Sequence, residues 1–231
     1  MAITDAVARA AAQAAGGAKI ERCAGQDAVG TAISIYDRAV KLTGGQWATT
    51  AFICTNDGYW DALSAAPISY AMHMPIFLTN GSKSISAETL AALKRGGIHE
   101  VYIVGGTLAI SQTVETAIKN AGIVIGNRLA GQTAVETSEE VATYGMKRGM
   151  SANLMGVATT NGYWDALSGS AFCGKKHSVI VLVNSPNCHS IKSFMFLNSA
   201  RVRQAYVFGG VMAVAQTTFE AARRSLSGLL S

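Results

Sequence analysis

The sequence is poor in charge and proline and contains no long hydrophobic run. Charged residues make up 14% of the 231 residues and hydrophobic residues 49%, a balance that excludes a disordered polyelectrolyte and predicts one or two packed domains. Three prolines beside 24 glycines favour many short turns over proline-rich linkers. No stretch approaches the roughly 18 uninterrupted apolar residues of a membrane helix, so membrane insertion is not expected.

The cysteines do not form a recognisable metal or redox motif. Cys23, Cys54, Cys173 and Cys188 include no CxxC pair and lack metal-like histidine spacing, so no metal site is expected. An even number of cysteines allows two disulfides in three pairings, whereas four buried free thiols is the simpler reading and is slightly favoured. Both alternatives stay open at the level of sequence.

The chain contains an internal repeat, which decides the fold prediction. The seven residues Gly58–Ser64 recur unchanged as Gly162–Ser168, an offset of 104 positions. At the same offset the run 101–106 matches 205–210, and 76–80 matches 180–184. Two copies of one module of about 105 residues are therefore predicted, at 24–129 (copy one) and 130–231 (copy two).

The first residues resemble the end of a copy. Ile3 and the segment 21–25 match Ile110 and the segment 127–131, so residues 1–23 are interpreted as the tail of a truncated upstream repeat. No signal peptide is visible at the start. Apolar residues at helical spacing predict a helix from Ile3 to about Ala15 that packs against copy one, with Ile3, Val7, Ala10, Ala11 and Ala14 on its buried face.

Within a copy, short apolar runs alternate with helical patterns. In copy one, strands are expected at 51–54, 75–78 and 101–104, with helices at 26–42, 59–72, 86–95 and 110–121. Alternation of strand and helix at this spacing is typical of right-handed parallel crossovers. The predicted fold class is α/β, with tandem three-layer α/β/α modules and mainly parallel sheets.

Three repeated features could carry chemistry, and each has a structural alternative. Asp61 and Asp165 open a helix, where a carboxylate complements the helix dipole. The paired glycines 105–106 and 209–210 follow a strand but lack the GxGxxG spacing, so a tight turn is favoured over a dinucleotide site. The Tyr-Trp pairs at 59–60 and 163–164 are interpreted as lids over the carboxyl edge of the sheet in preference to sugar-stacking platforms.

No catalytic arrangement or cofactor is expected. The four histidines are read as having no repeated partner, and no Ser-His-Asp or Cys-His arrangement can be nominated. A small-ligand enzyme that uses the Gly-Gly turns remains an alternative, which a deep polar pocket at the carboxyl edge of the sheet would favour.

The positive charge is concentrated in copy two. Copy one carries seven basic and seven acidic residues, whereas copy two carries nine and five, a balance of +4. Six of the nine precede the apolar runs that are expected to be strands, and parallel strands start at one edge of a sheet. These residues are expected to cluster at the amino edge of copy two, where they suit an anionic polymer or form a solvated rim: Lys147, Arg148, Lys175, Lys176, Arg201 and Arg203.

The ordered motifs resemble the type 2 cell wall-binding repeat of surface and S-layer proteins from Gram-positive bacteria. The segments that carry the resemblance cover nearly the whole of each copy, and in copy one they are Gly25–Ala32, Tyr59–Ala65, Pro75–Thr79 and Val101–Gly106. The resemblance implies a non-catalytic module, located outside the cell, that anchors a surface protein non-covalently to an anionic wall glycopolymer. It also implies tandem modules around a common axis, with no nucleic acid as partner.

Two departures from the family pattern concern the ligand. An arginine of the opening motif is replaced by Ala28 and Ala134. The Ile-Leu-Leu triplet, which the resemblance implicates in polymer binding, becomes Ile76, Phe77 and Leu78 in copy one and Ile180, Val181 and Leu182 in copy two. A second alternative is a structural module for adhesin or S-layer assembly, and self-association through repeat interfaces would favour it.

Overall fold

The computed structural model describes residues 3–229 and contains two parallel sheets. In copy one the strand order is β2-β1-β3-β4, and all pairings are parallel. The strands are β1 (Thr50–Cys54), β2 (Ile76–Leu78), β3 (Glu100–Val104) and β4 (Val124–Leu129), and the helices are α2 (Ala28–Leu42), α3 (Trp60–Met72), α4 (Ala87–Arg95) and α5 (Gln112–Asn120).

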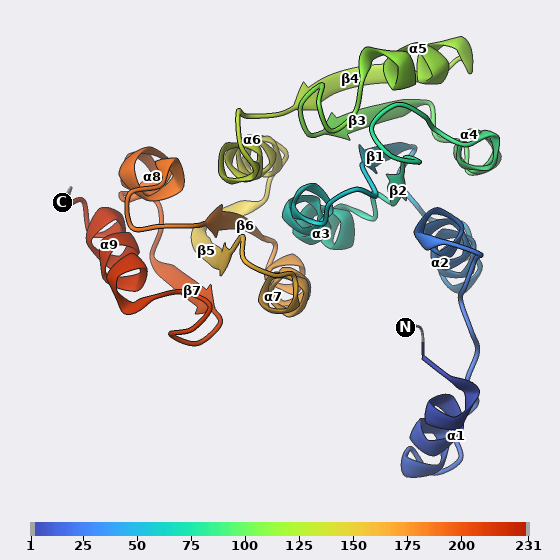
Figure 1. The fold of residues 1–231 in the computed structure, drawn as a ribbon, viewed down its shortest axis with the longest axis horizontal. Helices are drawn as coiled ribbons and strands as arrows, with labels where there is room; N and C mark the ends of the chain where they lie inside the picture. Colours follow the sequence, from blue (N-terminus) through green and yellow to red (C-terminus); the bar gives the residue numbers. More distant parts are fainter. Residues whose placement is uncertain (1–2, 230–231) are drawn as a thin grey trace.

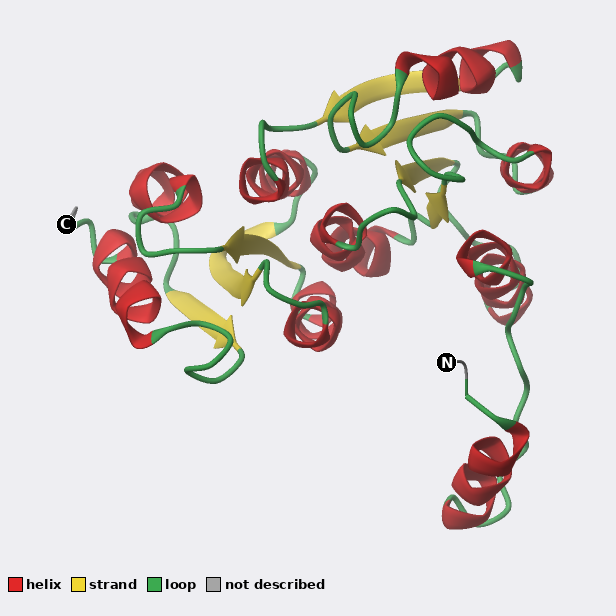
Figure 2. Ribbon diagram, viewed as in Figure 1, coloured by secondary structure: helices red, strands yellow, loops and turns green. Residues whose placement is uncertain are grey.

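Copy two repeats this organisation with a three-stranded parallel sheet of order β6-β5-β7. Its strands are β5 (Ser151–Thr159), β6 (Ser178–Val183) and β7 (Gln204–Phe208). Its helices are α6 (Ala134–Lys147), α7 (Trp164–Lys175), the π-helix η1 (Ser190–Met195), the short α8 (Phe196–Asn198) and α9 (Gln216–Leu226). The predicted α/β class and parallel sheets are confirmed, whereas β4 and the π-helix were not predicted (Figure 2).

The opening motif of each copy fixes the start of a helix. Asp27 caps α2 by accepting the Gly30 amide at 2.8 Å, and Thr133 with Glu136 forms a capping box on α6. In both copies a threonine hydroxyl one turn further on accepts the amide of the motif glycine at 3.1 Å, in the pairs Gly25–Thr31 and Gly131–Thr137. The motif therefore encodes a helix start in both copies, although its usual arginine is absent.

Side-chain alternation along β1 assigns the two faces of the first sheet. Ala51 and Ile53 face α2, α4 and α5 in one buried cluster, whereas Phe52 and Cys54 face α3 and the copy-two helix α6 in another. All four side chains are fully buried. Both faces of a parallel sheet need such cover, and copy one receives part of it from copy two.

Helix α6 lies between the two sheets and joins the copies into one core. Val141 and Ala142 of α6 pack in the cluster that holds Phe52 from β1 and Val181 from β6 (Figure 1). Gly145 lets α6 approach α3 closely, because a Cβ at this position would lie 2.8 Å from the Cδ1 atom of Ile68. The Ser138 hydroxyl accepts the Leu182 amide at 2.9 Å, which satisfies part of the free edge of β6.

The repeated Tyr-Trp pair of copy one forms contacts with copy two. The indole Nε1 of Trp60 donates to the Thr160 carbonyl at 2.9 Å, and the Tyr59 hydroxyl accepts the Gly162 amide at 3.2 Å. The Ser170 hydroxyl of α7 donates to the Leu63 carbonyl of α3 at 3.0 Å. The Tyr-Trp pair of copy one therefore packs against the loop that follows β5 in copy two.

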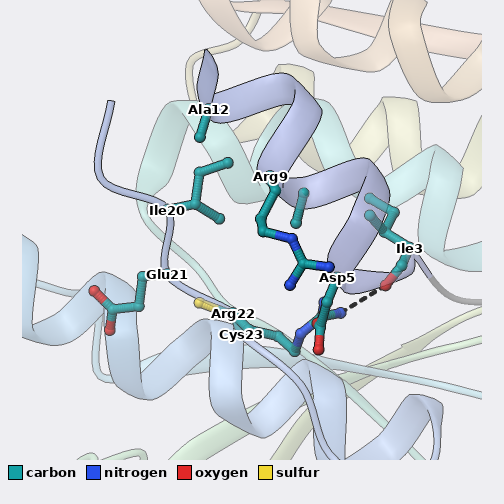
Figure 3. A pocket seen from close by; sticks show the side chains of 9 residues that line it. Ile3, Asp5, Arg9, Ala12, Ile20, Glu21, Arg22 and Cys23 are labelled. Carbon is teal, nitrogen blue, oxygen red and sulfur yellow. Dashed lines mark hydrogen bonds and ion pairs between the residues drawn. The ribbon is translucent and has the colours of Figure 1, made fainter. Parts of the chain in front are cut away.

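The helix α1 (Asp5–Ala14) forms as predicted, but its predicted docking against copy one is wrong. It has no buried residue, Ile3 and Val7 stay 65% and 56% exposed, and the helix projects away from the sheets (Figure 1). Its contacts are made with the segment that follows it, where Arg22 donates to the Ile3 carbonyl at 2.8 Å and binds Asp5 at 2.7 Å (Figure 3). The helix pairs with its own following segment, as α5 does with β4.

The structure decides two further expectations, one about disulfides and one about the histidines. All four cysteines are free, with Cys54, Cys173 and Cys188 buried and Cys23 partly exposed. The reading that no histidine recurs is wrong, because His73 and His177 stand 104 positions apart and both adopt a left-handed φ, of 53° and 50°. His73 is the C-cap of α3 and His177 follows the C-cap of α7, and histidine tolerates the left-handed conformation better than most residues do.

The repeated aspartates, Asp61 and Asp165, lie beneath the glycine turns. Asp61 and Asp165 abut Gly105 and Gly209, whose φ angles of 111° and 110° suit glycine, and a Cβ on either glycine would clash with the carboxylate. Burial raises the pKa of the Asp61 carboxyl to about 6. The Gly-Gly sequence is thus a tight turn packed on an aspartate.

Among residues 3–229, no helix is both long enough and apolar enough to cross a membrane.

We predict that Trp60→Phe lowers the free energy of unfolding by about 1 to 2 kcal/mol, because it removes the indole hydrogen bond and some buried surface. The matched control is Trp164→Phe at the equivalent position of copy two, where the side chain is 65% exposed and a change within about 0.5 kcal/mol is expected. Urea unfolding measures both variants. Equal losses would show that the Trp60 contact does not hold the copies together.

We predict that Asp61→Asn makes the chain more stable than the wild type at pH 7, by up to about 2 kcal/mol after allowing for solvent screening. In the unfolded chain the Asp61 carboxyl has a pKa near 3.9, which is below its folded value of about 6. The contribution of the protonated carboxyl to the stability of the wild type is therefore fully present below pH 4 and is lost as the pH rises through 6. Unfolding curves at pH 4 and pH 7 measure the effect. A difference in stability between the variant and the wild type that is the same at pH 4 and pH 7 would contradict the prediction.

Candidate functional site

The six basic residues identified from the sequence all precede strands of the copy-two sheet. They come in three pairs, one before each strand: 147–148 before β5, 175–176 before β6, and 201 with 203 before β7. Because β5 pairs in parallel with both β6 and β7, the three pairs lie at one edge of the sheet, with the β5 pair in the middle. We call this set of six residues the basic edge.

The basic edge is exposed, and the counter-charge from the described part of the chain is limited to Glu100 of copy one, which interacts electrostatically with Arg148. All six side chains are exposed, and none makes an ion pair within residues 3–229. Lys147, Lys175 and Lys176 stand at the carboxyl ends of helices, where a cation also interacts favourably with the helix dipole. The arrangement leaves the charges available to an external anion.

Arg148 is the most firmly placed member of the basic edge. Its guanidinium lies 5.5 Å from the ring centroid of Tyr144 and 5.9 Å from that of Tyr102 in copy one. Its Nε donates to the Tyr144 hydroxyl at 3.2 Å, and this hydrogen bond is the main reason that the pKa of Arg148 is raised. The two tyrosines were not predicted as part of the site, because they come from different copies and only the packing of α6 brings them together.

The acidic residues of copy two lie away from the basic edge. Helices in this fold run from the carboxyl edge of the sheet to its amino edge, and Glu136, Glu139 and Glu140 belong to the first half of α6 while Asp165 opens α7. Glu139 is buried and bonded to His189 at 2.7 Å and to Ser190 at 2.9 Å. These four acids therefore stand away from the basic edge, and the fifth acid of copy two, Glu220, pairs with Arg223 on α9 at 2.8 Å.

The two apolar triplets lie inside the protein. Phe77 in β2 and all three residues of the copy-two triplet in β6 are fully buried, and their neighbours Ile76 and Leu78 pack against the core. The buried side chains have no surface to offer a polymer. The structure gives the triplets a packing role in their sheets.

The carboxyl edge of copy one is occupied by protein. The Asp61 carboxylate fills the space under Gly105, and the Tyr59–Trp60 pair is used at the contact between the copies. No group of three or more potential metal ligands occurs within residues 3–229. In copy two the Tyr163–Trp164 pair is stacked with ring centroids 4.7 Å apart and remains exposed.

Comparison with known proteins agrees with this architecture. The model of the family "Cell wall binding domain 2 (CWB2)" matches residues 22–115 and 128–219. Among solved structures, the chain is similar to Cwp6 from Clostridium difficile, with a TM-score of 0.76, 25% identity, and coverage of 87% of this chain and 31% of that one. Cwp8 from the same organism has a TM-score of 0.75 at 20% identity, covering 97% of this chain and 37% of its own.

Two curated relatives come from Bacillus subtilis (strain 168). The N-acetylmuramoyl-L-alanine amidase LytC is 31% identical over 202 residues, which are 87% of this chain and 38% of that protein. The amidase enhancer is 29% identical over 111 residues, or 47% of this chain and 15% of the relative. The chain thus spans well under half the length of either relative. The two family matches, one in each copy, show that this chain belongs to the cell wall binding domain 2 family and is a cell wall-binding module.

Proposed function

We propose that this module holds a surface protein at the cell wall by binding an anionic wall glycopolymer along the basic edge of copy two. The observation that carries the proposal is that six exposed cations lie at one edge of the sheet and none of them makes an ion pair within residues 3–229. Membership of the cell wall binding domain 2 family supports the wall as the location of the ligand.

The geometry of a parallel sheet supports a linear ligand. Neighbouring strands lie about 4.8 Å apart, so the three pairs of cations span roughly 10 Å across the sheet. A polymer with repeated phosphate or carboxylate groups can engage several of these cations at once, and each contact raises the effective concentration of the next. Arg148, held against Tyr144, provides a preorganised cation in the middle of the row.

We propose further that the chain acts without catalysis. Family membership identifies a binding module, and the amidase activity named for LytC belongs to a protein of which the matched region is 38%. The functional role of the triplets would then be indirect: they shape β2 and β6, and β6 is preceded by Lys175 and Lys176. An extracellular position at the wall follows from the family to which the chain belongs.

Assembly is a second candidate function, favoured by one observation. Leu63 and the Tyr59–Trp60 pair are covered at the contact between copies, whereas their counterparts Leu167, Tyr163 and Trp164 remain 58%, 43% and 65% exposed. An exposed apolar group of this kind is a candidate surface for self-association. A chain that self-associates and ignores purified walls would favour assembly over anchoring.

We predict that replacing Lys175, Lys176, Arg201 and Arg203 together by Ala weakens retention on purified cell walls by at least tenfold, because four of six cations are lost. The residues are exposed, so stability should change by no more than about 0.5 kcal/mol for each. The matched control replaces four exposed cations of charge-balanced copy one, Lys41, Lys83, Lys94 and Arg95. Cosedimentation with walls measures retention, and equal effects of the two variants would contradict the assignment.

We also predict that retention of the wild-type chain weakens as salt rises from about 0.05 to 0.5 M, because the Debye length falls from roughly 14 to 4 Å. The quadruple variant of copy two should show a shallower dependence on salt. Walls stripped of their anionic polymers should retain little protein at any salt concentration. Binding that is independent of salt would mean that the basic edge does not carry the attraction.

A further inference from the structure

Arg148 is the cation of the basic edge that lies over aromatic rings. Its guanidinium is 5.5 Å from the ring centroid of Tyr144 and 5.9 Å from that of Tyr102, and the two ring centroids are 4.6 Å apart. Phe52 packs against both rings, at 5.9 Å from Tyr144 and 6.4 Å from Tyr102. Because Phe52 is fully buried, the rings under the guanidinium are anchored in the close-packed core.

The place that holds Arg148 is built by both copies. Arg148 is the C-cap of α6 and Tyr144 lies within that helix, whereas Tyr102 lies in β3 of copy one. Tyr206, which stands 104 positions after Tyr102, contacts Phe172 instead and accepts a hydrogen bond from Gln204. A single copy therefore does not contain this arrangement, which depends on the packing of α6 against the first sheet.

The hydrogen bond of Arg148 leaves the far end of its guanidinium free. Nε donates to the Tyr144 hydroxyl at 3.2 Å, whereas Nη1 and Nη2 have no hydrogen-bond partner among residues 3–229. The Arg148 side chain is exposed. An anionic group with two oxygens on one atom can accept a hydrogen bond from each terminal nitrogen, and such bidentate pairs are stronger and more directional than contacts with an ammonium group.

One carboxylate acts on the same guanidinium. Glu100 begins β3, and its side chain lies over Gly126 of β4, where a Cβ would clash with the carboxylate. The pKa of Arg148 is raised mainly by the hydrogen bond to Tyr144, and the charge of Glu100 adds a smaller contribution. A negative charge near the guanidinium also repels an incoming anion, so Glu100 opposes binding at Arg148.

We propose that Arg148 is the specificity-determining residue of the basic edge, that it binds one anionic group of the wall polymer through Nη1 and Nη2, and that Glu100 weakens this contact. The group is a phosphate diester or a carboxylate, since each presents two oxygens on one atom. Tyr102 and Tyr144 are positioning residues that hold the guanidinium. This assignment rests on the proposed function, because the polymer must lie along the basic edge to reach Arg148.

Recognition by geometry and attraction by charge differ in their response to salt. The number of cations that a polyanion neutralises sets how steeply its affinity falls as salt rises, whereas a lost hydrogen bond lowers the affinity at every salt concentration. A lysine at position 148 keeps the charge but not the two parallel donors. Arg148→Lys should therefore weaken binding without changing the salt dependence.

The first experiment measures retention of the whole chain on purified cell walls over a range of salt concentrations. We expect Arg148→Lys to weaken retention about tenfold with an unchanged salt dependence. The matched control is Arg95→Lys in copy one, which also keeps its charge and should retain the parent affinity. Retention of Arg148→Lys that equals the parent would overturn the inference.

The variant that lacks Lys175, Lys176, Arg201 and Arg203 separates this inference from the proposed function. If that quadruple variant weakens retention while Arg148→Lys does not, the basic edge binds polymer by charge alone and only the inference fails. If the quadruple variant retains the parent affinity, the proposed function fails. Calorimetry with a linear polyphosphate and with an oligogalacturonate then identifies the anionic group: the polyanion that loses affinity for Arg148→Lys carries it, and a loss for neither overturns the inference.

The positioning role has its own test. Tyr102→Leu removes one ring beneath the guanidinium without a change in charge, so retention should fall several-fold with an unchanged salt dependence. Tyr206→Leu, at the equivalent position of copy two, should leave retention unchanged. Circular dichroism verifies that both variants fold. Equal retention by the two variants would show that Tyr102 does not position Arg148, which contradicts a site built by both copies.

The opposing role of Glu100 is tested by a double-mutant cycle. Glu100→Gln should tighten retention several-fold in the parent chain, because it removes the charge that repels the polymer, and should give little gain in an Arg148→Ala background. An equal gain in both backgrounds would show that Glu100 does not act at the Arg148 contact, and this part of the assignment would be wrong.

Discussion

The burial of α6 between two sheets is the contact on which the structure depends. A parallel sheet must be covered on both faces, and copy one alone covers its second face only with α3. Helix α6 belongs to copy two by sequence but supplies Val141 and Ala142 to a cluster that includes β1 of copy one. Gly145 and Ile68 show how closely the helices of the two copies meet. The copies are therefore repeats in sequence but form one packed unit.

This packing also decides which surface remains available for binding. Ligands of open α/β sheets commonly lie at the carboxyl ends of the strands. In copy one that edge holds the Asp61 carboxylate under Gly105 and the Trp60 contact with Thr160, so protein atoms fill it. The amino edge of copy two has none of these contacts and carries the exposed cations. The carboxyl edge of copy one is thus filled by protein, whereas the amino edge of copy two, where Arg148 also contacts Tyr102 of copy one, leaves its cations exposed.

Much of this could be predicted from the sequence, because the signals were local and repeated. Buried strands appear as apolar runs, and the 104-residue offset placed each strand of copy one on its counterpart. β4 was missed because Val124 is 59% exposed and the strand contains Gly126 and Asn127, which give no apolar run. The docking of α1 was predicted from its match to the helix at 110–121 and from its apolar spacing, but its relation to the segment 20–23 matches α5 with β4 rather than a contact with copy one.

The residues of the candidate site also divide into those that the sequence could predict and those that it could not. Charge and strand order were enough to gather the six cations at one edge, since both are read along the chain. Whether a residue faces solvent depends on the sheet around it. The resemblance implied that the triplets bind polymer, but the sheets place them in the core. The contact of Arg148 with Tyr102 joins residues from two copies, and no pattern in either copy signals it.

The most direct test of the account is a titration of the isotope-labelled chain with soluble anionic wall polymer, followed by amide chemical shifts. The account predicts that the largest shift changes map to 147–149, 175–177 and 201–203 at the amino edge of copy two, and that they diminish as salt is added. Changes centred instead on the carboxyl edge, around Gly162 and Gly209, with the basic edge unaffected, would contradict it.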